Sequence, residues 1–416
     1  MKRKSWLKRI GPGFITGAAD DDPSGIATYA QTGVQFGYGQ LWTSLFSFPF
    51  MAAVQEMCGR IGMVTGQGLS TVVRRHYARP VLFAAVLLLL AANTVNIGAD
   101  LGAMAASAQL VFGVPFAVWL LGLTALTLVL EVFVSYPRYA KFLKYLTLSL
   151  FGYVIAAFLV KQDWRAAAVS TFLPMFQWNK AYVMNVVAVL GTTISPYLFF
   201  WQADEEVEEE MAAHKIKLPG MRPRVSKRDV RGMRADTVLG MFFSNLVMFF
   251  IILIAASTLR AHGVTAVATA DQAAALLRPV AGPFAELLFA LGILGTGLLA
   301  VPVLAGSASY AVAEAVGWNG GLYRKLKEAH GFYGVLTLAT IVGLVVNFLR
   351  IPAFTMLYDT AMLNGLIAPP LLILILLVAN NKKIMGKRAN GWLSNALGIV
   401  VTGVMTVAAV ALFVVR

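Results

Sequence analysis

Residues 11–39, GPGFITGAADDDPSGIATYAQTGVQFGYG, place three consecutive aspartates and a proline in the middle of a stretch that otherwise suits the membrane. Pro23 removes a backbone donor and clashes with the preceding turn, while Gly25 tolerates dihedral angles that other residues avoid. We expect one helix to end near Ala19 and the next to begin near Ser24. Since irregular backbone in hydrocarbon is tolerated only beside a cavity or packed protein, this break marks a candidate site.

The rest of the chain carries the composition of a membrane protein. Of its 416 residues, 58% are hydrophobic and 13% are charged, whereas soluble domains carry about 25% charged residues. Apolar runs of the length that a bilayer requires recur throughout. The sequence therefore predicts an all-α, polytopic membrane protein with eleven spans, near 11–36, 41–63, 80–110, 115–136, 142–160, 181–203, 235–259, 284–316, 331–349, 354–379 and 393–415.

The distribution of the basic residues that give the net charge of +14 indicates the membrane topology. With the N-terminus inside, 27 of the 34 Lys and Arg residues fall on the cytoplasmic side of these spans, as the positive-inside rule requires. We therefore expect a multi-pass protein of the bacterial inner membrane with a cytoplasmic N-terminus and a periplasmic C-terminus. We expect the protein to lie in the lipid bilayer as a monomer and to bind no nucleic acid. The single cysteine, Cys58, excludes a disulfide within one chain.

A second break is expected in the sixth span, AYVMNVVAVLGTTISPYLFFWQ (181–202), where Gly191 and Pro196 bracket a short polar run. The two breaks occupy corresponding positions of two five-span halves, 11–160 and 181–379, within one transmembrane domain, 1–416, that ends with the span 393–415. Because five is odd, the halves must insert with opposite orientation. Paired broken helices in inverted halves are the best sequence indication of a transporter's central site.

The residue types at the two breaks favour a cation. Freed carbonyls near Ala19 and Thr192 can face it, and the ends of the half-helices add negative partial charge. Asp22 supplies a formal charge, and three adjacent carboxylates cannot all stay ionised in low dielectric without a counter-cation. For Asp20 and Asp21 an alternative stays open, in which they cap the second half-helix or reach a water-filled vestibule.

These segments resemble the NRAMP family of divalent metal transporters. The resemblance rests on GPGF at 11–14, the Asp22–Pro23 break, QTGVQFGYGQLW at 31–42, QEMCGRIGMVTG at 55–66, FGVP at 112–115 and KKIMG at 382–386. It covers nearly the whole chain and implies a LeuT-like fold, with two inverted five-helix repeats and an extra helix. It also implies a divalent metal ion as substrate, no cofactor and no enzymatic activity.

The departures from the family pattern bear on the ion. The family's Asp-Pro-Gly-Asn motif is replaced by Asp22-Pro23-Ser24-Gly25, and its Met-Pro-His motif is replaced by Ser195-Pro196-Tyr197. A hydroxyl thus stands where a thioether would favour soft metals. Small Gly25 and Ser195 would leave room for the waters that Mg²⁺ keeps. The combination looks like the NRAMP-related magnesium branch, so we expect Mg²⁺, with Mn²⁺ as a second substrate.

Proton coupling is not expected. Of the family's two acids on the third span, the resemblance leaves Asp100 and puts Ile97 at the other position, while Tyr197 replaces the His. The alternative function is a proton-coupled Mn²⁺/Fe²⁺ symporter. Asn364 on the tenth span lies near a position where the family contributes a further ligand or gate. The acidic run 204–210 is expected to be a solvated helix end balanced by the basic loop that follows, with the alternative that it concentrates cations at the inner exit.

Overall fold

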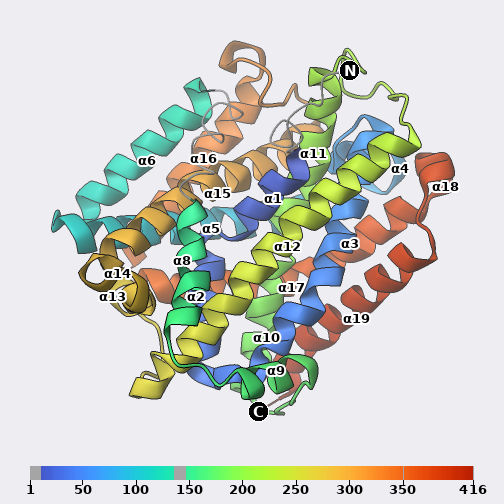
Figure 1. Cartoon of the computed structure of the whole chain (residues 1–416). Coiled ribbons are helices and arrows are strands. Elements are labelled where there is room, and N and C mark those ends of the chain that lie inside the picture. The colour runs from blue at the N-terminus through green and yellow to red at the C-terminus, as the bar shows by residue number, and fades with distance from the viewer. Residues whose placement is uncertain (1–10, 135–146, 350, 416) are drawn as a thin grey trace, which may run out of the picture.

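The computed structural model describes residues 11–134, 147–349 and 351–415, and every regular element in these residues is a helix (Figure 1). The first half contains α1 (Pro12–Asp20), α2 (Pro23–Phe36), α3 (Trp42–Thr65), α4 (Leu69–His76), α5 (Arg79–Phe112), α6 (Phe116–Phe133), α8 (Phe151–Leu159) and α9 (Trp164–Phe172). The second half contains α10 (Lys180–Thr193), α11 (Pro196–Ala212), α12 (Lys227–Ser257), α13 (Ala270–Ala274), α14 (Arg278–Ala281), α15 (Ala285–Val316), α16 (His330–Val346), α17 (Ala353–Asn380), α18 (Lys382–Met385) and α19 (Trp392–Val414). Short 3₁₀ turns join several of them, at Gly37–Gln40, Thr147–Leu150, Arg260–His262, Ala275–Leu277, Gly282–Phe284, Leu326–Glu328, Asn347–Leu349 and Gly386–Arg388.

The predicted spans correspond to these helices. Eight helical segments in the described residues are long and apolar enough to cross a membrane, and a shorter apolar helix covers Leu148–Leu159. The first predicted span, α1 with α2, is absent from the eight because it carries three aspartates and many polar residues, whereas the equally broken sixth span, Lys180–Ala212, is included. Helix α3 is long enough, but its second half carries Gln55, Glu56 and Arg60. The expected all-α membrane fold is confirmed, while part of the predicted span 142–160 lies outside the described residues.

Both expected helix breaks are present. Helix α1 ends at Asp20, and α2 starts at Pro23, whose missing N–H matters least in the first turn of a helix. Helix α10 ends at Thr193 and α11 starts at Pro196. Each break is two residues long, so the helices run closer to the proline than the sequence predicted.

The two broken helices run in opposite directions through the bundle. In Figure 1, α1 and α11 lie in one half of the molecule, and α2 and α10 lie in the other. Helix α1 therefore packs beside α11, and α10 packs beside α2. This arrangement supports the proposed inverted halves, 11–160 and 181–379.

Helix α1 lies directly on α12. A Cβ atom added to Gly17 would overlap the backbone of Gly240, so the two helices approach as closely as glycine allows. Small residues at such contacts are typical of helix packing in membranes. The carboxylate of Asp236 on α12 accepts hydrogen bonds from the backbone N–H groups of Gly11 and Phe14, both at 3.0 Å. Asp236 thereby satisfies the free amides at the start of α1.

The acidic run at the end of α11 is not the solvated helix end that the sequence suggested. Asp204, Glu206 and Glu210 are each no more than 4% exposed. One salt bridge of the expected kind does form, between Glu210 and Lys215 at 2.9 Å. The prediction was wrong for these three residues because helix packing covers them, whereas Glu209 is exposed.

The contact between α1 and α12 can be tested with Gly17→Ala. The added methyl group has no space, and overpacking of this kind costs about 1–3 kcal/mol. We expect a clearly lower melting temperature for the detergent-solubilised protein. Gly122→Ala is the matched control, since nothing lies within 4 Å of a Cβ at that helical glycine. Equal melting temperatures for both variants and the unmodified protein would contradict this packing.

Candidate functional site at the two helix breaks

Asp22 lies at the centre of the first break and is 1% exposed. It is the N-cap residue of α2: its Oδ1 accepts hydrogen bonds from Gly25 N at 2.8 Å and Ser24 Oγ at 2.7 Å. Its Oδ2 accepts a hydrogen bond from Asn96 Nδ2 on α5 at 3.0 Å. Two donors from α2 and one from α5 therefore hold the Asp22 carboxylate, whose oxygens can only accept hydrogen bonds, in one orientation.

The start of α2 meets the end of α10. Ser24 Oγ lies 3.2 Å from Thr192 Oγ1, and Tyr29 Oη lies 3.2 Å from Thr193 Oγ1. All four side chains are buried. The two breaks, separated by about 170 residues in the sequence, thus join through hydroxyl groups at the same depth of the bundle.

The other two half-helices meet in the same way. Tyr197 Oη in the first turn of α11 donates a hydrogen bond to the Ala19 carbonyl near the end of α1, at 2.9 Å. Ser195 Oγ donates to the Thr192 carbonyl at 2.6 Å. The two carbonyls that the sequence offered as cation ligands therefore each carry a hydroxyl donor. A carbonyl oxygen has two lone pairs, so each could still contact an ion while it accepts this hydrogen bond.

Several buried oxygen atoms close to Asp22 have no donor. Asn96 Oδ1 is one of them, on the same side chain that donates to Asp22. One turn further along α5, Asp100 is fully buried, and neither of its carboxylate oxygens has a hydrogen-bond partner in the described residues. Because buried acceptors without a partner are costly, this group of oxygens needs a cation or a proton.

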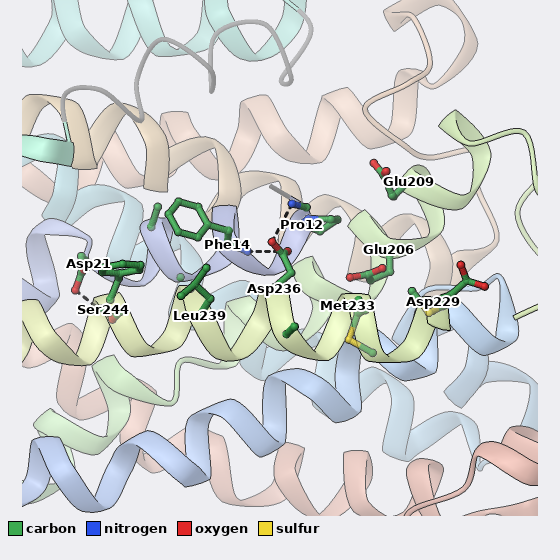
Figure 2. Close-up of a pocket in the computed structure, with 18 of the residues that line it drawn as sticks. Pro12, Phe14, Asp21, Glu206, Glu209, Asp229, Met233, Asp236, Leu239 and Ser244 are labelled. Atoms are coloured by element: carbon green, nitrogen blue, oxygen red, sulfur yellow. Dashed lines mark hydrogen bonds between the residues drawn. The ribbon is translucent and has the colours of Figure 1, made fainter. Parts of the chain in front are cut away.

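The three aspartates point to different places. Asp22 caps α2, the role that the sequence left open for Asp20 and Asp21. Ser244 on α12 instead lies beside the other two, with its Oγ 2.7 Å from Asp20 Oδ2 and 3.2 Å from Asp21 Oδ1. Asp20 is fully buried, whereas Asp21 borders a cleft (Figure 2).

This cleft, which we call the α1–α12 cleft, has a volume of about 900 Å³. It lies between α1, α11, α12 and residues 148–151. Figure 2 shows Asp21 and Ser244 at one end, Asp236 in the middle, and Glu209 and Asp229 at the other end. Asp22 does not border it, so the central carboxylate is closed off from this cleft.

The remaining predicted residues lie around this centre. A Cβ on Gly25 would sit 3.3 Å from a ring carbon of Tyr29 and 3.5 Å from Asp22 Oδ1, so the space there holds little more than a methyl group. Asn364 on α17 is 1% exposed and its Nδ2 has no partner in the described residues. The next residue, Gly365, packs tightly against Val187 of α10. No hydrogen bond of the described residues joins Asn364 to the breaks.

The sequence alone did not assign Asn96, Ser244, Tyr29 or Thr193 to the site. Asn96 could have been suspected, because a helix with asparagines and an aspartate at 93, 96 and 100 has a polar face. Single hydroxyls in long apolar helices, such as Ser244, give no such signal. In the described residues no three His, Cys, Asp or Glu side chains converge on one point. A cation here would be bound by mixed oxygen ligands and water, which suits hard divalent ions.

Comparisons with known proteins identify the family. The model described as natural resistance-associated macrophage protein-like (Nramp) matches residues 13–415. A "Divalent metal cation transporter MntH" of Mycobacterium leprae is 27% identical over 308 residues, which cover 72% of this chain and 69% of the relative. The protein of the same name from Chromohalobacter salexigens is 27% identical over 309 residues, covering 71% and 68%. These names describe transporters, not enzymes, and give no support to a magnesium branch.

Solved structures show the fold. A manganese transporter of Eremococcus coleocola superposes with a TM-score of 0.76 at 16% identity, covering 98% of this chain and 87% of that one. Mhp1, a nucleobase-cation-symport-1 family transporter, superposes with a TM-score of 0.61 at 13% identity, covering 98% and 92%. The expected LeuT-like fold is thereby confirmed. With a family model that spans nearly its whole length, the chain belongs to the Nramp family.

Proposed function

We propose that this protein is a secondary transporter that carries divalent metal cations through the membrane, with Asp22 as the central ligand. The observation that carries this proposal is the cluster of oxygen atoms where the two helix breaks meet. One carboxylate, three hydroxyls and an unpaired amide oxygen surround that point: Asp22, Ser24, Thr192, Ser195 and Asn96. Half-helix ends add partial charge of both signs.

The hydrogen bonds at the breaks suggest how binding and movement are linked. Hydroxyl groups donate to both candidate carbonyls and to Asp22. A cation would compete for these acceptors, so the hydroxyls would rotate and the bonds between half-helices would rearrange. An ion that binds one arrangement more tightly than another shifts the population between them. Alternating access would follow from this shift around a fixed site.

For the ion we propose Mn²⁺ first, because the relatives and the solved neighbour bear names that refer to divalent metals and manganese. Mg²⁺ is the second candidate, on a specific observation. The side chains around Asp22 are hydroxyl, amide and carboxylate groups, without a thioether at Ser195. Oxygen ligands favour hard ions. The tight space beside Gly25 leaves little room there for retained water.

We propose uptake that is driven by the membrane potential and not by protons. Tyr197 stands where the family has a His, and its hydroxyl is bonded to the Ala19 carbonyl. Ile97, at the second acid position, is fully buried in the apolar core. A divalent cation entering down about 100 mV gains about 4.6 kcal/mol, enough for a gradient of about three decades.

The central test is Asp22→Asn in proteoliposomes. Asparagine remains a good N-cap residue, so α2 should stay folded while the charge is lost. We expect Mn²⁺ uptake, followed with an internal dye, to fall to the level of empty liposomes. Internal pH recorded in the same vesicles should stay constant during uptake by the unmodified protein.

Glu131→Gln is the matched control, since Glu131 is a buried acid of α6 outside the breaks. It should transport as the unmodified protein does. Uptake by Asp22→Asn at the unmodified rate would remove Asp22 from the site. Acidification that follows Mn²⁺ influx would replace voltage-driven uptake by proton symport.

Two alanine variants of α5, at Asn96 and at Asn93, can distinguish a role of Asn96 in metal binding from a role in helix packing. Asn96→Ala removes the donor that orients Asp22, and losing such a partner typically weakens metal binding about 10–100-fold. Asn93→Ala is the control, because Asn93 is equally buried but donates to the Leu304 carbonyl at 2.9 Å. Titration calorimetry with Mn²⁺ should show weaker binding in the first variant only. Equal losses in both would mean that Asn96 serves packing.

Ion preference can be tested at Ser195. A thioether at this position should favour the softer ion, so Ser195→Met is expected to raise Mn²⁺ uptake relative to Mg²⁺ by about tenfold. Ser195→Ala, which removes the hydroxyl without adding sulfur, should leave the ratio close to that of the unmodified protein. If the two variants show the same ratio, Ser195 does not contact the ion.

A further inference from the structure

The α1–α12 cleft ends at a pair of acids that the central site does not use. Asp20 and Asp21 are 0% and 5% exposed, and one hydroxyl, Ser244 Oγ, lies within hydrogen-bond distance of both. A serine hydroxyl has a single hydrogen and can donate it to only one of them. Two carboxylates deep in the bundle thus share one donor.

The remaining oxygens of this pair have no donors. Asp20 Oδ1 is buried without a partner. Within the part of the chain that the structure describes, Asp21 Oδ2 accepts no hydrogen bond either. None of the ion pairs found there includes Asp20 or Asp21. The free oxygen belongs to the residue that borders the cleft, so a ligand in the cleft could reach it (Figure 2).

Acidic side chains recur along the cleft between largely apolar walls. Beyond Asp21 the cleft passes Asp236, Glu206 and Glu209 (Figure 2). The two basic residues that border it, Lys215 and Arg228, lie with Asp229 in the segment beyond α11 and at the start of α12. Lys215 is already paired, at 2.9 Å from Glu210 and 3.3 Å from Asp229. Six carboxylates and two basic side chains thus border the cleft, and an excess of negative charge concentrates cations.

The size of the cleft and the lack of converging ligands indicate the form of the ion. No three acidic, His or Cys side chains of the described residues converge on one point, so an ion stripped of water would lack ligands here. Each water occupies about 30 Å³, so a hydration shell of six fits readily into about 900 Å³. Mg²⁺ in particular keeps its waters.

We propose that Asp21, together with Ser244 and Asp20, forms a second cation site at the inner end of the α1–α12 cleft. The site binds a hydrated divalent cation through its water shell. This inference rests on the proposed function, because the ion bound here is the transported ion that also binds at Asp22. In the orientation that the charge distribution predicts, the cleft opens to the cytoplasmic side, because its open end carries the basic segment that follows α11. An ion leaving Asp22 would meet Asp21 next and regain its water there.

Hexaamminecobalt(III) is a suitable probe. Its ammine ligands do not exchange, so it imitates a fully hydrated cation and cannot enter a site that requires bare metal. Titration calorimetry on the full-length protein in detergent should show binding of this complex. Asp21→Asn should weaken it about tenfold, which corresponds to about 1.4 kcal/mol. Glu131→Gln, which removes a buried acid outside the cleft, should bind it as the unmodified protein does.

Asp22→Asn distinguishes this inference from the proposed function. It should abolish Mn²⁺ uptake and still bind the cobalt complex. If Asp21→Asn binds the complex as tightly as the unmodified protein, or if Asp22→Asn loses it to the same extent, there is no separate site at Asp21. A protein that binds the complex through Asp21 but moves no divalent ion would retain the second site and overturn the transport proposal.

Discussion

The structure depends on the hydrogen bonds that join two helix breaks inside the membrane. Each break exposes backbone groups that hydrocarbon cannot satisfy. Side chains supply partners here: Tyr197 of the second break donates to the Ala19 carbonyl of the first, and Ser195 donates to the Thr192 carbonyl within its own break. The hydroxyls of Ser24 and Thr192 also join the two breaks. Asp22 caps α2 and is held by Asn96 of α5. Without these hydrogen bonds, the backbone groups at the two breaks would have no partners in the membrane. The geometry of the candidate site and the stability of the fold therefore depend on the same contacts.

The same arrangement makes the site responsive to an ion. Every hydrogen bond at the breaks uses a hydroxyl or an amide donor, and none of the ion pairs found in the described residues lies there. Hydroxyl donors can turn away without leaving a buried charge behind. A cation can therefore replace them at modest cost. Helix α1 is fixed at its start by Asp236 and along its length by the Gly17 contact with α12, so movement at the break would carry α12 with it.

The sequence predicted the parts that depend on local chemistry. Pro23 and Pro196, each next to polar residues in mid-span, located both breaks to within a few residues. Proline alone would not have done so, because Pro49, Pro302, Pro369 and Pro370 lie inside continuous helices. Asp22 was singled out for its position beside the proline. Asn96 and Ser244 were not, since their roles depend on how α5 and α12 are rotated about their axes, which a mostly apolar helix does not record. The prediction for the acidic run 204–210 failed for the same reason. Its charge indicated exposure to solvent, but the packing of the surrounding helices buries Asp204, Glu206 and Glu210. The expectation of Mg²⁺ rested on two substitutions, and the names of the relatives, which refer to divalent metal cations in general, do not support it.

The central claim is that a cation binds where the two breaks meet. The most direct test is anomalous X-ray diffraction from crystals of the full-length protein grown with Mn²⁺, recorded at the manganese edge. The account predicts a peak within coordinating distance of the Asp22 carboxylate, between the end of α10 and the start of α2. A map with the strongest peak elsewhere and no density beside Asp22, or helices that continue unbroken through residues 21–22 and 194–195, would contradict it.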